Sequence, residues 1–206
     1  MSGKRAPTCT RFLRMPDGIP PSWFDAGSPR LEVDFGCHRG TFLVGMAESY
    51  PETNFLGIEK QAARVEKCLK KIRFHGLPNA LAVQGEGAAA LAQWLPEESV
   101  STIHVSFPDP WPKRRHASRR LITREFLDGI ARVLRRGGVL RLMTDDMAYF
   151  SEMKNLVRDG WEELPWEDGV VRPVTAFEKT FLELGHHPYR SASRPIRPSA
   201  LCNGAL

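Results

Sequence analysis

Short apolar runs alternate with amphipathic stretches along the middle of the chain, and this alternation predicts strands and helices in turn. Five runs have the length and composition of strands: LEVDF (31–35), NFLGIE (54–59), ALAVQ (80–84), STIHVSF (101–107) and VLRLMTD (139–145). Apolar residues at helical spacing predict helices over 61–74, 124–135 and 147–158. This order of elements is typical of an α/β fold, a doubly wound and mostly parallel sheet with helices on both faces.

Each predicted helix has one apolar face that we expect to be buried. The residues on these faces are Val65, Cys68, Leu69 and Ile72 in the first helix, Phe126, Ile130, Val133 and Leu134 in the second, and Met147, Phe150, Met153 and Val157 in the third. Gly137 is expected to end the second helix in the left-handed conformation. Two weaker strands are predicted near 161–164 and 179–184.

Length and composition indicate one domain. A chain of 206 residues with 42% hydrophobic content can bury one substantial core, but it is too short for two full-sized domains. We expect the domain to span residues 31–186. Residues 1–30 (basic at the start) and 187–206 are rich in proline, serine and arginine and lack periodicity, so we expect a flexible N-terminal segment and a disordered tail. The chain has no apolar signal region and no run of eighteen apolar residues, which favours a cytoplasmic protein.

Charge and cysteine content narrow the choice of partners. A formal net charge of +5 and an isoelectric point near 9.2 favour anionic partners such as nucleic acid. The four cysteines are widely spaced and the six histidines show no ligand spacing, so we expect neither a disulfide framework nor a metal site.

Acidic residues stand at or just past the predicted strand ends: Asp34, Glu59, Glu86, Asp109 and Asp145. Open parallel sheets bind ligands beyond the carboxyl ends of their strands, where strand order reverses, so these side chains are candidates for a binding site. Acidic residues after strands also commonly cap the helices that follow. Helix capping can explain any single one of the five residues more easily than it can explain all five together.

The segment VDFGCHRGTFL (33–43) has the form of a cofactor loop between a strand and a helix. Glycines at 36 and 40 suit a nucleoside without a pyrophosphate, such as S-adenosylmethionine, and Glu59, at the end of the next strand, can accept both hydroxyls of its ribose. His38 stands where a further glycine is expected. We expect the loop to bulge, the imidazole to face solvent and binding to be weakened; loss of cofactor binding is the alternative.

The segment SFPDPWPKRRHASRR (106–120) combines a constrained carboxylate with a cluster of cations. Asp109 lies between two prolines, which restrict the backbone on both sides and hold the side chain in place. Trp111 and the basic residues that follow it suggest phosphate contacts beside a stacking surface. The basic residues are Lys113, Arg114, Arg115, Arg119 and Arg120.

From about residue 31 to 186, the chain resembles the bacterial tRNA (guanine-N7-)-methyltransferases, class I enzymes with a Rossmann-like fold that use S-adenosylmethionine. The motifs that carry the resemblance are DFGCHRG, NFLGIEK, FPDPWPKRRHASRR, GGVLRLMTDD and VTAFEKTFLELGH. The resemblance implies methyl transfer to N7 of the variable-loop guanine of tRNA, at position 46. The loop residues His38 and Arg39 and the tail after His186 depart from the family pattern.

The resemblance also implies roles for individual residues. The cofactor would be held by Asp34, Gly36, Gly40, Glu59, Glu86 and Asp109, with Asp109 also the catalytic carboxylate. The substrate would contact Lys113, Asp145, Thr175 and Glu178, and the tRNA backbone would contact Arg114, Arg115, Arg119 and Arg120.

Several alternatives remain open at the level of sequence. Thr175 and Glu178 also have the spacing of a capping box, which would make them the start of a helix. The chain could be an RNA-binding protein that has lost its cofactor through His38, or a methyltransferase acting on another RNA or a small molecule. The sequence does not decide between a monomer and a homodimer.

Overall fold

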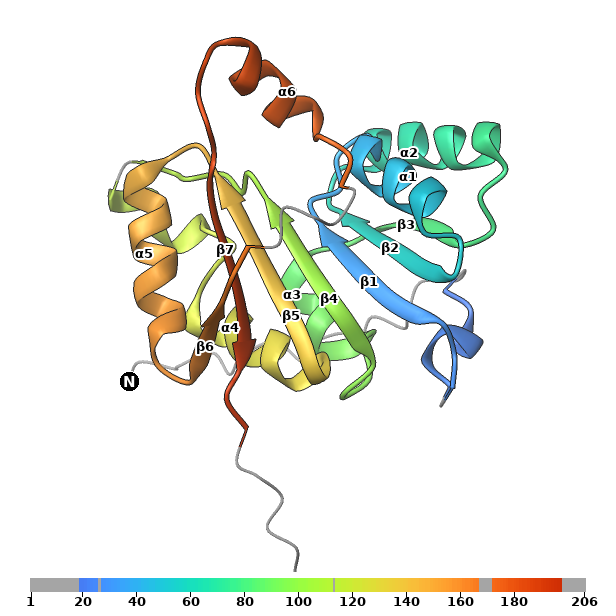
Figure 1. The fold of residues 1–206 in the computed structure, drawn as a ribbon, viewed down its shortest axis with the longest axis horizontal. Coiled ribbons are helices and arrows are strands. Elements are labelled where there is room, and N and C mark those ends of the chain that lie inside the picture. The colour runs from blue at the N-terminus through green and yellow to red at the C-terminus, as the bar shows by residue number, and fades with distance from the viewer. Residues whose placement is uncertain (1–18, 26, 113, 167–171, 198–206) are drawn as a thin grey trace, which may run out of the picture.

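The computed structural model describes residues 19–25, 27–112, 114–166 and 172–197, which build a seven-stranded sheet with helices on both faces (Figure 1). The strand order is β3-β2-β1-β4-β5-β7-β6. The parallel strands are β1 (Arg30–Phe35), β2 (Thr53–Glu59), β3 (Ala80–Gln84), β4 (Val100–Ser106) and β5 (Leu134–Thr144). β7 (Tyr189–Pro195) runs antiparallel to both of its neighbours, β5 and β6 (Trp161–Leu164).

Helices cover the sheet unequally. Side chains of α3 (Gly87–Gln93), α4 (Arg124–Val133) and α5 (Met147–Arg158) share one core with the strands. Those of α1 (Thr41–Ser49) and α2 (Ala62–His75) form a second core on the opposite face. α6 (Ala176–Glu183) stands beyond the edge at which β4 and β5 end (Figure 1). Two short 3-10 helices, η1 (Pro21–Phe24) and η2 (Arg114–Arg119), complete the described elements.

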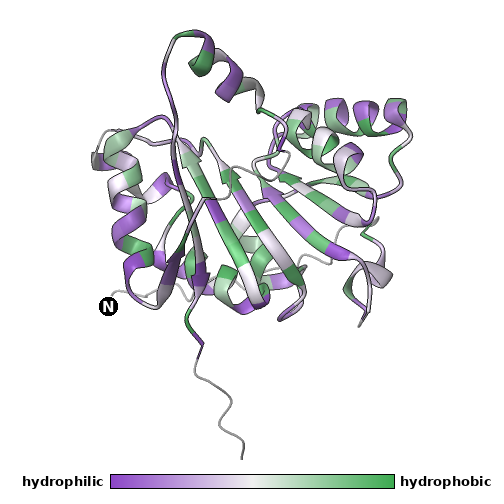
Figure 2. Ribbon diagram, in the orientation of Figure 1, coloured by the Kyte–Doolittle hydropathy of each residue, from purple (hydrophilic) through white to green (hydrophobic). Residues whose placement is uncertain are grey.

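The alternation of side chains along each strand explains the two cores. Leu31, Val33 and Phe35 of β1 all belong to the core with α3, α4 and α5, whereas Phe55 of β2 points into the core with α1 and α2. Figure 2 shows apolar and polar residues alternating along the central strands and mixed along the helices. Complete burial of a side chain of this size contributes about 1.5–3 kcal/mol, so the alternating pattern holds each strand in register.

The path of the chain places a ligand site at one edge of the sheet. From β1 the chain moves outward through β2 to β3, then returns to β4 on the other side of β1. Strand order therefore reverses between β1 and β4, and the loops that follow these two strands diverge at their carboxyl ends. Open α/β sheets bind ligands in the crevice that this divergence creates.

Two predictions for the last part of the chain are wrong. Residues 179–184 do not form a strand, because a capping box begins α6 at Thr175 and the helix runs to Glu183. Residues 189–195, expected in a disordered tail, form β7 within the sheet. β7 lacks an apolar pattern because small residues fill its buried positions, namely Ser191, Ala192 and Ser193.

Two further expectations are corrected in the middle of the chain. Gly137 has the predicted left-handed backbone, with φ of 75°, but α4 has already ended at Val133 and the glycine lies in an irregular stretch of β5, where residues 135–138 oppose a single residue of β4. Met147 is 61% exposed rather than buried. The buried stripe of α5 instead runs through Tyr149, Met153 and Val157, four residues apart.

Candidate functional site

The loop after β1 turns sharply before α1 begins. Gly36, His38 and Gly40 all have left-handed backbones, with φ of 79°, 52° and 72°. A Cβ at Gly36 would meet no atom within 4 Å, so glycine is needed here only for the left-handed backbone conformation of the turn. At Gly40 a Cβ would lie 2.1 Å from Cys68 Sγ, so this glycine also allows the loop to pack directly on α2.

Glu59, the last residue of β2, is fixed by backbone amides. The amide of His38 donates to Oε2 over 3.2 Å and the amide of Gln61 donates to Oε1 over 2.9 Å. The Arg64 guanidinium lies 3.6 Å from Oε2. A carboxylate can accept about four hydrogen bonds, so each oxygen retains capacity toward the cleft that Glu59 lines. This is the arrangement needed to accept two ribose hydroxyls.

His38 keeps the loop's backbone function although it replaces a glycine, because its left-handed backbone presents the amide to Glu59. Its imidazole is half-buried and lies edge-on to Phe177 of α6, with ring centroids 6.2 Å apart. The expectation that the ring faces solvent is therefore only partly met. Burial lowers the pKa of His38, which favours the neutral ring.

Asp34 lies beneath this loop. Its side chain is buried, and burial raises its pKa to about 6, with a smaller contribution from the nearby Glu59 carboxylate. His104 acts in the opposite direction. A buried carboxylate whose charge is costly in this way is well suited to receive a positively charged ligand group, because the ligand would offset the cost.

Two adjoining cavities open at this edge of the sheet. The larger is a cleft of about 700 Å³ that Glu59, Glu86 and Asp109 line from three different strand ends. The smaller, of about 50 Å³, is lined by Asp34 and Thr175 among others. Five residues border both cavities and so lie between them: Gly36, His38, Ser106, Phe107 and Phe177. The cleft is within the usual size range for small-molecule sites.

Asp109 lies on a loop whose backbone is strained. Phe107 and Trp111, on either side of it, are left-handed with φ of 53° and 42°. Such angles cost a residue with a side chain roughly 1–3 kcal/mol each and persist only where neighbouring groups enforce them. Pro108 is buried and anchors the start of the loop, while the Asp109 carboxylate is exposed to the cleft.

Arg120 is the group that holds this loop. Its Nε donates to the Pro110 carbonyl over 2.7 Å and its Nη2 donates to the Trp111 carbonyl over 3.3 Å. The guanidinium also pairs with Glu152 and lies over the Tyr149 ring, 5.1 Å from the centroid. α5 therefore supports the Asp109 loop through a single arginine.

The other basic residues of the segment are more exposed. Arg119 lines the cleft and its guanidinium lies 5.1 Å from the centre of the Trp111 ring, and Arg115 bonds to His116. Arg114 begins η2. Lys113 and the side chain of Arg114 lie outside what the structure describes.

Thr175 and Glu178 form the capping box that their spacing allows. Thr175 Oγ1 accepts from the Glu178 amide over 3.0 Å, and the Thr175 amide donates to the Glu178 carboxylate over 3.3 Å. Glu178 is 1% exposed and pairs with Arg172 and Arg190 over 2.6 and 2.8 Å. Burial raises the pKa of Glu178, but the hydrogen bond from Arg172 and the other contacts outweigh burial, so the pKa lies below its ordinary value.

The structure does not bring every predicted site residue to the cavities. Thr175 borders the smaller one, whereas Glu178 and Asp145 border neither. Glu86 occupies the N-cap position of α3 without a capping hydrogen bond from its side chain, and it is exposed in the cleft. The sequence interpretation missed Phe107 and Phe177; the only signal for the second was its place inside the VTAFE motif.

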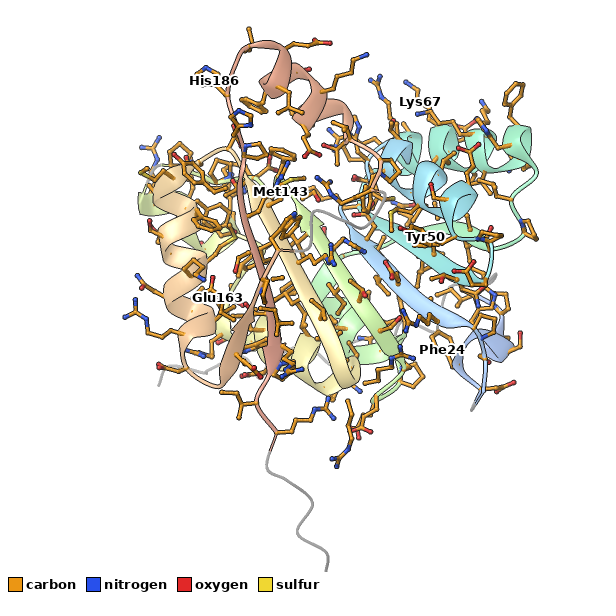
Figure 3. The ribbon with its side chains drawn as sticks, viewed as in Figure 1. Phe24, Tyr50, Lys67, Met143, Glu163 and His186 are labelled. Carbon is orange, nitrogen blue, oxygen red and sulfur yellow. The ribbon has the colours of Figure 1, made fainter. Side chains whose placement is uncertain are left out.

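The polar groups fit a nucleoside that carries positive charge. Carboxylates approach the cavities from β1, β2 and the loop after β4, and Glu59 is oriented for a pair of hydroxyls. Within the described ranges, no group of three or more histidine, cysteine or acidic side chains could hold a metal ion. Arg119 and Arg120 line the cleft from the basic segment, while Lys60 and Arg64 line it beside Glu59. Figure 3 labels Lys67 on α2 and His186 after α6, both at the end of the molecule where β4 and β5 terminate.

The fold is that of the class I methyltransferases that use S-adenosylmethionine. A family model described as "Putative methyltransferase" matches residues 29–191. A solved structure, the aminoglycoside resistance methyltransferase NpmB1, superposes with a TM-score of 0.57 over 82% of this chain and 88% of that one, and its 22% identity supports the fold alone.

Curated relatives identify the branch of the class. The tRNA (guanine-N(7)-)-methyltransferase of Limosilactobacillus fermentum is 35% identical over 170 residues, which cover 78% of this chain and 78% of the relative. The enzyme of the same name from Buchnera aphidicola is 37% identical over 163 residues, or 76% of this chain and 66% of the relative. The chain belongs to the tRNA (guanine-N(7)-)-methyltransferase family. No described helix is both long and apolar enough to cross a membrane.

Proposed function

We propose that this chain transfers a methyl group from S-adenosylmethionine to N7 of the variable-loop guanine of tRNA, as the names of its relatives suggest for the base and the RNA. One observation carries the proposal. A single cleft is lined by the amide-fixed Glu59 on one side and by Asp109 and Arg119 on the other. A nucleoside donor, a purine and an RNA phosphate can therefore be held by one continuous surface. Because its substrate is tRNA, we expect the protein in the cytoplasm.

The geometry of the two cavities supports cofactor roles for three carboxylates. Glu59 would accept the ribose hydroxyls, and Glu86, exposed at the start of α3, would lie near the adenine. Asp34, which borders the smaller cavity, would face the positively charged methionine end. Bound S-adenosylmethionine supplies a methyl group that its sulfonium makes electrophilic.

Guanine N7 carries a lone pair and no proton, so the reaction needs no general base. The protein has to align the two reactants and exclude water, and correct positioning can remove roughly 7–11 kcal/mol of a barrier. Asp109 would accept hydrogen bonds from guanine N1 and N2, which adenine cannot provide in the same pattern. Because the methylated base becomes cationic, the carboxylate also favours the transition state over the ground state.

Asp109→Ala tests the assignment. Methyl transfer should fall about 100- to 1,000-fold or more, as expected for removal of a group that stabilises developing charge, while tRNA binding stays nearly intact. A single-turnover assay with labelled cofactor, followed by mapping of N7-methylguanosine in the tRNA, measures both the rate and the position. Asp128→Ala, an exposed aspartate of α4 that does not line the cleft, is the matched control. Undiminished transfer by the Asp109 variant would refute the role.

The alternative of an RNA-binding protein without cofactor predicts a different result. Since the His38 amide still bonds to Glu59, the loop retains the contact that a damaged site would lose. Isothermal titration with S-adenosylmethionine separates the two: absence of heat at millimolar cofactor would support the binding protein.

A further inference from the structure

An exposed aromatic side chain lies between the two cavities of the site. Phe177, on the first turn of α6, is 56% exposed although it is apolar, and it borders both cavities. Large apolar side chains left open beside a ligand cleft commonly serve recognition, because their exposure has a cost that bound ligand removes.

Its neighbours place Phe177 between the cofactor loop and the Asp109 loop. On one side the His38 ring meets it edge-on, with centroids 6.2 Å apart and an interplanar angle of 71°. On the other side the Phe107 ring stacks with it, at 6.0 Å and 28°. Phe107 directly precedes the PDPW segment and borders both cavities as well. Phe177 is therefore beside the position at which the methyl donor and the acceptor base must meet.

Phe177 is not needed to anchor α6. Phe181, one turn later, also stacks with Phe107, at 5.8 Å and 11°. The buried Glu178, paired with Arg172 and Arg190, fixes the start of the helix to the rest of the chain. Phe181 and Glu178 do not border either cavity, whereas Phe177 does. The helix thus has separate residues for attachment and for contact with the cleft.

We propose that Phe177 is the surface on which the target guanine stacks during methyl transfer. The inference rests on the proposed function and adds to it the residue that supports the face of the base. A base withdrawn from its RNA stack regains stacking on an aromatic side chain. As N7 becomes methylated the purine gains positive charge, so its attraction to an aromatic face grows toward the transition state.

The test compares two phenylalanines that contact the same partner ring. Phe177→Leu should lower kcat for tRNA methylation about 10- to 100-fold at saturating tRNA and S-adenosylmethionine, because loss of base stacking is felt most in the transition state. Phe177→Tyr, which keeps the ring, should restore kcat to within about threefold of the natural chain. Phe181→Leu should leave kcat and KM for tRNA within about threefold, whatever it does to the melting temperature.

Other outcomes would overturn the inference. Equal losses in Phe177→Leu and Phe181→Leu would mean that the ring only attaches α6. A weaker cofactor Kd with normal kcat at saturation would mean that the ring covers the cofactor rather than the base. Failure of the natural chain to form N7-methylguanosine would refute the proposed function itself, and it is observed before any variant is made.

Discussion

Substitution of Arg120 can distinguish a residue that positions the Asp109 loop from one that binds RNA. The sequence places it in a basic run that suggests phosphate contacts, but its guanidinium bonds to the carbonyls of Pro110 and Trp111. We predict that Arg120→Lys slows methyl transfer by disordering the Asp109 loop. Lysine keeps the charge and loses the planar fork that reaches two carbonyls at once.

The magnitude follows from the contacts that the substitution removes. Each hydrogen bond from a charged donor contributes about 1.5–3 kcal/mol, and lysine can retain one of the two. The pair with Glu152 adds little, since that carboxylate is half-exposed. Release of backbone strain at the left-handed Phe107 and Trp111 favours the disordered loop further. A net loss of about 2–3 kcal/mol corresponds to a fall in kcat of about 30- to 150-fold.

Single-turnover methylation at saturating tRNA measures this effect, and tRNA binding at several salt concentrations supplies the second readout. Arg120→Lys and Arg120→Gln should keep the natural log–log salt slope, because no phosphate contact is lost. Arg115→Gln, the exposed comparison, should reduce the slope by about 0.7–0.9, the value for one phosphate. A reduced slope with unchanged kcat in the Arg120→Gln variant would refute the positioning role and support the RNA contact.

Three further substitutions test the packing beneath the site. The Asp34→Asn variant should gain stability relative to the natural chain as pH rises from about 4 to above 6, by up to about 3 kcal/mol. The reason is that the folded pKa of Asp34, about 6, lies above the ordinary 3.8, so the buried charge destabilises the natural chain once it forms. Urea unfolding at pH 4.5 and 8 checks this, and a pH-independent difference would contradict it. Glu178→Gln should speed amide hydrogen exchange in α6 about 100-fold, with α2 as internal reference. The reason is that breaking the buried ion pair with Arg172 costs about 3 kcal/mol or more. Unchanged protection would show that this ion pair does not hold the helix. Gly40→Ala should lower the melting temperature about 4–8 °C more than Gly76→Ala does. Both glycines have positive φ, but only a Cβ at position 40 would clash with Cys68 Sγ, an overpacking of about 2 kcal/mol. Equal shifts would mean that the loop can move aside.

The central strands and the buried face of α4 could be predicted from the chain because local periodicity decides them. Ile130 and Val133 are fully buried, as their spacing indicates. β7 could not be predicted in this way: Ser191 and Ser193 occupy buried positions in a strand whose partners are far away in the sequence. Helix α6 was missed although its capping box was recognised, since its few apolar side chains suit a strand equally well.

For the site, the sequence by itself determined that Glu59 and Asp109 meet at the ligand edge, although Asp145, predicted there on the same ground, borders neither cavity. Glu59 and Asp109 follow parallel strands, and parallel strands end at a common edge whatever their detailed packing. Only the tertiary structure decided what the neighbouring groups do. Arg120 faces carbonyls rather than solvent, Glu178 is enclosed by two arginines, and Phe177 is left open between two cavities. Such roles depend on the direction and partners of each side chain, which arise from contacts between segments distant along the chain and leave no periodic trace within it.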